Sequence, residues 1–104
     1  MGNYRGKLDI IADILRVARE NAKKTHIMYQ ANLSYKVLQR YLAKLIAASL
    51  ICFEDEKRCY MLTNKGQKFL DAYKRYHKTN RRIESRLNEA QAKREVLKNL
   101  CKVK

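Results

Sequence analysis

The sequence contains no proline and no tryptophan, and its 104 residues include only three glycines. Proline and glycine are the residues that most often interrupt helices, so a chain this poor in them is expected to be mostly helical with tight connections. It also lacks an apolar run near the roughly 20 residues that a membrane-spanning helix needs, and its first residues show no signal-peptide pattern. We therefore expect a cytoplasmic protein.

Motifs for chemistry are also missing. The three cysteines, Cys52, Cys59 and Cys101, form no C-x-x-C pair, and neither His26 nor His77 lies at metal-ligand spacing to them. No phosphate-binding loop, dinucleotide fingerprint or histidine–carboxylate pair is found. The sequence therefore predicts no enzyme, no metal, no cofactor and no small-molecule substrate.

Positive charge is what the chain has in excess. Its 24 Lys and Arg residues against 10 Asp and Glu residues give a formal net charge of +14. A charge that large favours a polyanionic partner, either nucleic acid or an anionic membrane surface. A hydrophobic content of 46% is enough for a small core, so we expect one folded domain plus at most an appendage.

Apolar spacing predicts a helix over about residues 7–22 and a short helix over residues 27–31, which Thr25 can cap. On the first helix we place Arg5, Lys7, Arg16 and Arg19 on the wet side. Asp9 and Asp13 lie one turn apart, and such a pair on an amphipathic helix is typical of a solvated face.

The next stretch is the best candidate for a binding element. Ser34 is a good N-cap, and the leucines at positions 38, 42 and 45 recur at helical spacing behind it. The opposite face carries only polar, aromatic or cationic side chains and no acid: Tyr35, Lys36, Gln39, Arg40 and Lys44. Such a face could enter a DNA major groove. Asn32 can take the left-handed conformation of the preceding turn, which completes a helix-turn-helix layout.

Residues 50–54 and 58–62 are rich in β-formers, and they predict a hairpin that would act as a wing. Lys57 and Arg58 lie at its tip, where a wing meets phosphates, but three acids at positions 54–56 lower the contribution we expect. A three-residue loop over 55–57 puts Cys52 opposite Tyr60, with positions 50, 52, 60 and 62 facing inward. A two-residue turn would instead bring Cys52 beside Cys59, so a disulfide there is the less favoured alternative.

Thr63 is expected to cap a helix from Asn64 to Lys102. An almost continuous apolar seam with heptad spacing runs along it, formed by Phe69, Tyr73, Tyr76, Asn80, Ile83, Leu87, Ala90, Arg94, Leu97 and Cys101. The far part of such a helix has nothing in the chain to cover it, so the pattern predicts a homodimer through this seam. Bulky aromatic residues near one end and Ala90 towards the other favour antiparallel pairing. We expect a head over residues 1–63 and a dimerisation helix over residues 64–104.

At this point the sequence resembles a known family. The residues that carry the likeness are the run 24–35 into Ser34 and Tyr35, the pairs 41–42 and 50–51, and the run 60–66, Tyr-Met-Leu-Thr-Asn-Lys-Gly. They resemble the small archaeal winged-helix DNA-binding proteins of chromatin type. The resemblance implies a winged-helix head, a C-terminal helix that dimerises as an antiparallel coiled coil, and sequence-tolerant binding that organises chromosomal DNA. Two departures are Ser49, where many winged helices have glycine, and the acidic wing tip without glycine.

The expected fold is thus mainly α with a small β-hairpin: a winged helix-turn-helix head plus a long C-terminal helix in an antiparallel two-stranded coiled coil. The expected function is double-stranded DNA binding by a homodimer, associated with chromosomal DNA. Its contacts would come from Ser34, the helix face above, the wing tip, and Lys23 and Lys24. An operator-specific transcription regulator and a coiled-coil interaction scaffold remain alternatives. Membrane association is disfavoured, because the basic residues look scattered rather than confined to one helix face.

Overall fold

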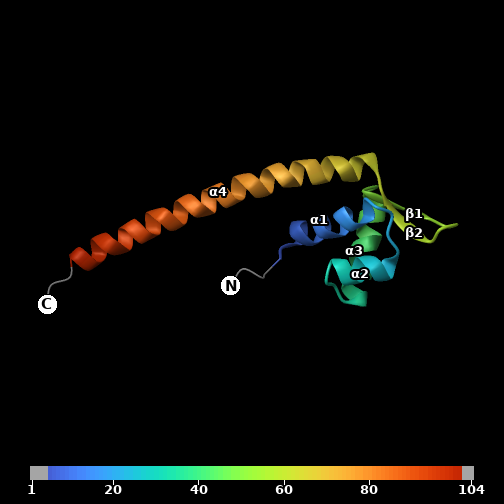
Figure 1. Ribbon diagram of the computed structural model, residues 1–104, viewed down its shortest axis with the longest axis horizontal. Helices are drawn as coiled ribbons and strands as arrows, with labels where there is room; N and C mark the ends of the chain where they lie inside the picture. The colour runs from blue at the N-terminus through green and yellow to red at the C-terminus, as the bar shows by residue number, and fades with distance from the viewer. Residues whose placement is uncertain (1–4, 102–104) are drawn as a thin grey trace. The chain divides into compact units, whose positions relative to one another are not determined.

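The computed structural model describes residues 5–101, and their elements follow one another as expected from the sequence (Figure 1). They are α1 (Lys7–Ala18), α2 (Lys24–Gln30), α3 (Tyr35–Ala47), the antiparallel strands β1 (Ile51–Glu54) and β2 (Cys59–Leu62), and α4 (Asn64–Leu100). The predicted fold class is confirmed: a mainly helical chain with a two-stranded hairpin and a long C-terminal helix. Within the described range, no helix is long and apolar enough to cross a membrane.

The chain divides into two compact units, the first ending at Tyr73 and the second beginning at Lys74. We call the first unit the head, and the part of α4 from Lys74 onward the distal helix. The boundary that we expected after residue 63 stays a prediction. In the structure, the first residues of α4 still belong to the head, because Leu70 and Tyr73 are buried in its core.

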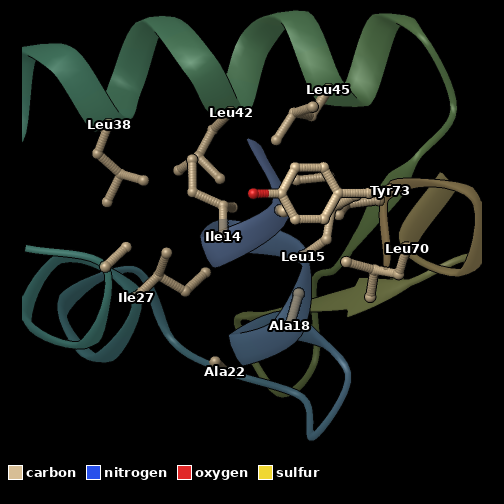
Figure 2. Packing of buried hydrophobic residues seen from close by; sticks show 13 residues of the cluster. Ile14, Leu15, Ala18, Ala22, Ile27, Leu38, Leu42, Leu45, Leu70 and Tyr73 are labelled. Carbon is tan, nitrogen blue, oxygen red and sulfur yellow. The ribbon is translucent and has the colours of Figure 1, made fainter. Parts of the chain in front are cut away.

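The core of the head forms where α3 packs on the helices before it. Figure 2 shows Leu38, Leu42 and Leu45 pointing from α3 towards Ile14 and Leu15 of α1. All five side chains are at most 3% exposed. The predicted apolar face of this helix is confirmed, and its burial fixes which side of α3 faces outward.

Helix α1 ends at Ala18 and not near residue 22 as predicted. Asn21 adopts a left-handed conformation with φ 57°, which stops the helix. Ala22 then pairs with Tyr60 of β2 through two backbone hydrogen bonds, of 3.1 and 2.8 Å. The hairpin therefore pairs with a third, very short segment at Ala22. The periodicity of apolar residues in a helix could not predict this pairing.

Helix α2 begins at Lys24, and its N-cap is Lys23, which makes no side-chain cap. The expectation that Thr25 caps this helix was wrong, since Thr25 lies within its first turn. Helix α2 ends at Gln30, one residue before the predicted end, and Asn32 has the predicted left-handed conformation with φ 52°. The Leu33 amide donates to the Met28 carbonyl at 3.0 Å, which is the Schellman arrangement that closes a helix at a left-handed residue.

The hairpin has a different register from the one predicted. Cys52 lies opposite Met61, and Phe53 lies opposite Tyr60 with their ring centroids 5.0 Å apart. The connection is a four-residue loop over 55–58, because Arg58 takes a left-handed conformation with φ 49°. Ile51 and Cys59 are the buried members of the strands, and Cys52 is exposed. The other three positions predicted to face inward, Leu50, Tyr60 and Leu62, are partly buried against the core.

This register also separates the two hairpin cysteines. Cys59 lies opposite Glu54 and not opposite Cys52, and both thiols are free. The disulfide alternative is thus not the arrangement that the structure adopts.

Thr63 joins three parts of the head. Its hydroxyl donates to the carbonyls of Ser49 at 2.6 Å and Leu50 at 3.0 Å, and it accepts from the Gly66 amide at 3.0 Å. The predicted cap of the long helix is therefore confirmed. A Cβ at Gly66 would lie 2.2 Å from the Leu50 carbonyl oxygen. Only glycine fits there, which gives the Leu-Thr-Asn-Lys-Gly run a packing reason. The helix end expected at Lys102 lies outside the described residues.

Candidate nucleic-acid interface

The outward face of α3 carries every side chain that the sequence assigned to it. Tyr35 is 55% exposed, and the four polar or cationic residues that follow on the same face, Lys36, Gln39, Arg40 and Lys44, are exposed as well. The leucines on the other side are buried, so folding itself sorts the helix into a core face and a cationic face. No acid occurs between Ser34 and Leu50.

The N-terminus of α3 is fixed by two contacts. The Ser34 side chain accepts a hydrogen bond from the Val37 amide at 3.3 Å, which confirms the predicted N-cap. The Lys24 ammonium lies 4.2 Å from the centroid of the Tyr35 ring, a cation–π contact between α2 and α3. The structure thus brings Lys24 to the start of the candidate binding helix, while Lys23 is exposed at the start of α2.

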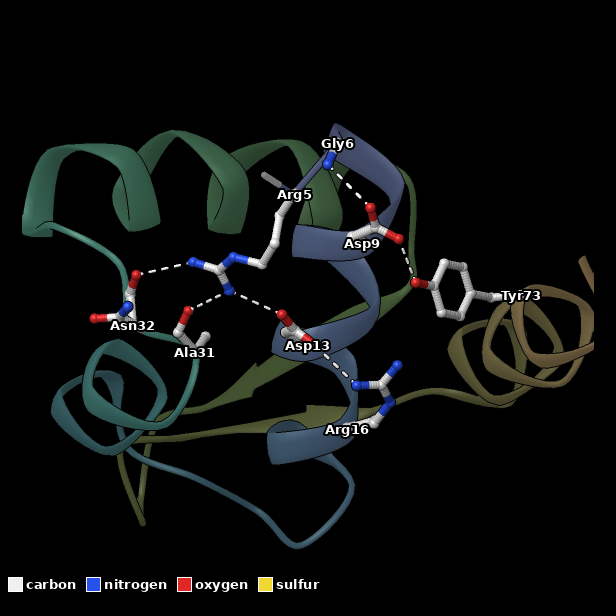
Figure 3. Close-up of polar contacts among 8 residues, drawn as sticks. All are labelled: Arg5, Gly6, Asp9, Asp13, Arg16, Ala31, Asn32 and Tyr73. Atoms are coloured by element: carbon white, nitrogen blue, oxygen red, sulfur yellow. Dashed lines mark hydrogen bonds and ion pairs between the residues drawn. The ribbon is translucent and has the colours of Figure 1, made fainter. Parts of the chain in front are cut away.

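The turn between α2 and α3 is held from outside by Arg5, as Figure 3 shows. Its guanidinium donates to the carbonyls of Ala31 at 2.6 Å and Asn32 at 2.9 Å, and to the Asp13 carboxylate at 2.8 Å. Asp13 also accepts from Arg16 at 2.8 Å. Our placement of Arg5 on the wet side of α1, and of Asp13 on a solvated face, was therefore wrong. The guanidinium satisfies carbonyls that the left-handed turn leaves without helical partners.

A second contact of α1 fixes α4. Asp9 accepts hydrogen bonds from the Gly6 amide at 3.0 Å and from the Tyr73 hydroxyl (Figure 3). Like Asp13, it is an anchor rather than a solvated carboxylate. Sequence reasoning missed both anchors because their partners lie far away in the sequence.

The wing loop carries the charges that the sequence placed there. Lys57 and Arg58 are exposed, and so are Asp55 and Glu56 beside them. Opposite charges within one short loop cancel much of its potential, so α3 is the stronger of the two candidate surfaces.

Tyr29 is an exposed residue that sequence reasoning did not single out. At 78% it is the most exposed of the large hydrophobic side chains on the described surface. The exposure of Tyr29 could have been inferred from the apolar residue Ile27 two positions earlier, which is buried in the structure. Residues two apart on a helix point in very different directions, so a buried Ile27 leaves Tyr29 facing solvent.

The seam of α4 falls into two parts. Tyr73 is 9% exposed and Phe69 packs against the head core, so these two side chains already have a cover within the chain. From Tyr76 onward the seam is open, as the exposed fractions show: Tyr76 56%, Ile83 52%, Leu87 58% and Leu97 63%. Ala90 and Cys101 are exposed, and the Asn80 amide donates to Glu84 at 3.4 Å. The assignment of the seam to a dimer interface stays a prediction.

Comparison with known proteins decides the family. Residues 4–81, about three quarters of the chain, match the winged helix-turn-helix family. The chain belongs to this family. The chain is 40% identical over 68 residues to the uncharacterized protein MJ0290 of Methanocaldococcus jannaschii, a match that covers 64% of this chain and 31% of that protein. The chain thus spans about a third of the length of this curated relative.

Two solved structures resemble the whole chain. One is Sso10a-2, described as a DNA-binding protein from Sulfolobus solfataricus, with a TM-score of 0.63 and 28% identity over 96% of this chain and 100% of that chain. The other is a cysteine-to-serine mutant of ZitR from Lactococcus lactis, with a TM-score of 0.56 and 16% identity over 96% and 76% of the two chains. The second likeness concerns the fold alone. The resemblance to archaeal winged-helix proteins is confirmed.

Proposed function

We propose that this protein binds double-stranded DNA through the outward face of α3 and does so as a homodimer with little sequence preference. The observation that carries the proposal is the division of α3 into a buried leucine face and an exposed cationic face without acids, in a chain of net charge +14. The likeness to a protein described as DNA-binding, over the full length of that protein, supports it.

The side chains of α3 divide into two kinds of contact. Gln39 and Arg40 are long enough to donate to base edges in the major groove, while Lys36 and Lys44 neutralise phosphates on its walls. Tyr35, held by Lys24, packs on the backbone, and the amides at the helix N-terminus after Ser34 offer an anion-binding position. Lys23 and Lys24 add phosphate contacts from α2, and Lys57 and Arg58 add them from the wing. Since most of these groups meet phosphates, the binding tolerates many sequences.

The open seam of the distal helix supports the dimer. A row of apolar side chains that are each more than half exposed is unfavourable in water, and a second copy of the same seam would cover it. In an antiparallel pair the two heads would stand at opposite ends of the paired helices. Such a dimer could hold two DNA segments, which is the basis for our proposal that it organises or bridges chromosomal DNA.

One observation favours a second function, that of an operator-specific transcription regulator. Gln39 and Arg40 are side chains of the types that make bidentate contacts with adenine and guanine. A third possibility, a scaffold that recruits a protein through the open seam, requires the seam to bind a different partner.

The salt dependence of DNA affinity tests the proposal. If each head neutralises about four to six phosphates, the logarithm of the affinity should fall with the logarithm of salt at a slope of about −4 to −5. Fluorescence anisotropy with random and with selected duplexes would measure it, and a slope near zero would exclude the DNA proposal. Affinities for random and selected sequences that agree within a few-fold would support the chromatin role. A much higher affinity for a selected sequence would support the operator-specific regulator.

Two substitutions in α3 test the binding face itself. Arg40→Ala should weaken DNA binding with little change in stability, whereas Lys93→Ala in the distal helix removes the same charge and should leave the affinity nearly unchanged. Leu42→Ala should destabilise the head by about 2–5 kcal/mol as a core truncation. Equal thermal melts for the Arg40 and Leu42 variants would mean that the faces of α3 are assigned wrongly.

A further inference from the structure

The distal helix carries its positive charge unevenly. Residues 74–86 include six Lys or Arg residues and one acid, whereas residues 87–100 include three Lys or Arg residues and two acids. The formal charge therefore falls from +5 in the first half of the distal helix to +1 in the second half. A charge that served only solubility would need no such asymmetry.

Four of the six cations of the first half share one side of the helix. At about 100° per residue, Lys74, Lys78, Arg81 and Arg82 lie within about 60° of the direction opposite the apolar seam. All four are exposed, and with His77 and Ser85 they line a shallow hollow on this face. We call these four residues the cationic stripe. Our expectation that the basic residues scatter around the helix does not hold for these four, whereas Arg75 and Arg86 lie on the flanks.

The stripe ends abruptly. Beyond Ser85 the same side of the helix continues with residues of other kinds, none of which is cationic: Asn88, Glu89, Ala92, Val96 and Asn99. Of the cations of the second half, Arg94 and Lys98 lie on the seam side, and Lys93 lies on the flank of the helix, about 80° from the direction opposite the seam. The distal helix therefore presents a defined cationic surface in its first half and no such surface in its second half.

The spacing of the cations within residues 74–86 lowers the stability of the helix. Lys78 is surrounded at all four of its helical neighbour positions by cations, namely Lys74, Arg75, Arg81 and Arg82. Like charges three or four residues apart each destabilise a helix by a few tenths of a kcal/mol. An anion bound along this face would remove the repulsion, so the arrangement points to an anionic ligand with repeating charges.

We propose that the cationic stripe is a second DNA-binding surface, which takes the phosphate backbone of a duplex independently of α3. The inference rests on the proposed function in that DNA is the partner. From Lys74 to Arg82 the helix rises about 12 Å, which corresponds to three to four phosphates of one strand at their rise of about 3.4 Å along the duplex axis. The surface holds only flexible cations and so binds without regard to sequence.

The proposed dimer favours a duplex over an anionic membrane. A helix that lies in a membrane surface buries its apolar side in the lipid. In the dimer that we propose, the second copy covers the apolar seam, so the seam is not available to a bilayer while the stripe stays exposed for a duplex.

A pair of charge-matched variants tests the proposal. Lys74→Gln with Lys78→Gln removes two charges from the stripe, and Lys93→Gln with Lys98→Gln removes two from the same helix outside it. The affinity of each full-length variant for a random duplex would be measured across a range of salt concentrations. The stripe variant should show a salt slope shallower by about 2, roughly 1 per lysine, while the control keeps the wild-type slope. Circular dichroism would verify that both variants keep their helix content.

The outcomes separate this inference from the proposed function. Equal slopes for the two variants, with Arg40→Ala still weakened, would overturn the stripe and leave binding by α3 intact. A wild-type slope near zero would overturn both. Flotation with phosphatidylserine vesicles provides the last arm. If the stripe variant loses vesicle binding but keeps the wild-type DNA slope, the stripe contacts a membrane and the proposal fails.

Discussion

The Tyr73 hydroxyl donates a hydrogen bond to the Asp9 carboxylate and so joins α4 to α1 across 64 positions of the sequence. The Arg16 guanidinium carbon lies 5.7 Å from the centroid of the same ring, and Phe69 stacks beside it with ring centroids 6.4 Å apart. Burial, together with the hydrogen bond to Asp9 and the negative charge of that carboxylate, raises the pKa of Tyr73 to about 12. The phenol must therefore stay protonated to hold α4 on the head.

This contact predicts a loss of stability in alkali. The unfolded chain releases the phenolic proton near pH 10 and the folded chain near pH 12, so between these values the folded state binds more protons and its stability falls as pH rises. Below pH 10 the contribution of Tyr73 is complete. Urea unfolding from pH 9 to pH 12 would measure the effect, and Tyr73→Phe should show a shallower decline than the wild type. Parallel declines in the two proteins would contradict it. Asp9→Asn, which removes the charge, should lower the pKa of Tyr73.

Gly66 predicts a local steric failure. In Gly66→Ala the new Cβ would lie 2.2 Å from the Leu50 carbonyl oxygen, which is backbone and cannot rotate away. We expect a loss of about 2–3 kcal/mol, as for other overpacked sites. Gly6→Ala is the matched control, because its Cβ would meet only Asp9 Oδ2 at 3.6 Å and its φ is −77°. Chemical denaturation of both variants would measure the difference, and similar midpoints would show that the head relaxes around position 66.

Ser49 is the site of an expected gain in stability. It follows α3 in a left-handed conformation with φ 62°, and the Leu50 amide donates to the Leu45 carbonyl at 2.9 Å in a Schellman closure. A non-glycine residue costs about 1–2 kcal/mol in that conformation. Ser49→Gly should therefore stabilise the head by about 0.5–1 kcal/mol after the entropy of glycine is counted. Ala48→Gly, at a right-handed position, should instead destabilise it. A lower melting temperature for Ser49→Gly would refute the argument.

The sequence predicts features whose causes lie within a few residues. The faces of α3 follow from the spacing of Leu38, Leu42 and Leu45, its start from Ser34, and the preceding turn from Asn32. In each case the local structure is determined by residues of that same segment. The prediction therefore needs no knowledge of distant contacts.

Features that depend on distant partners were not predictable. Arg5 reads as one more exposed cation until Ala31 and Asn32 are brought to it by folding. The hairpin register depends on Arg58 adopting a left-handed conformation, which arginine rarely does. Tyr73 has the heptad spacing of the seam. This spacing shows that its side chain needs a cover, but it does not show whether the head or a second helix provides that cover.

The open seam of the distal helix leads to the last prediction. If it forms the dimer, Ile83→Asp with Leu87→Asp should give monomers at micromolar concentration by sedimentation equilibrium, because four charges would be buried at the centre of the paired helices. Asn88→Asp with Ala92→Asp adds the same charges on the outward side and should remain dimeric. A dimeric Ile83/Leu87 variant would place the interface elsewhere.

The direction of the two helices can be tested through Cys101, which is exposed and lies on the seam. In a parallel pair, Cys101 would lie opposite Cys101 of the second copy, and mild oxidation would link the two chains. In the antiparallel pair that we propose, the cysteines lie at opposite ends, so a Cys52→Ser variant should resist cross-linking through Cys101. That variant removes the other exposed thiol, since Cys59 is buried. Rapid formation of a covalent dimer, seen on a non-reducing gel, would show parallel pairing and would remove the basis for two heads at opposite ends.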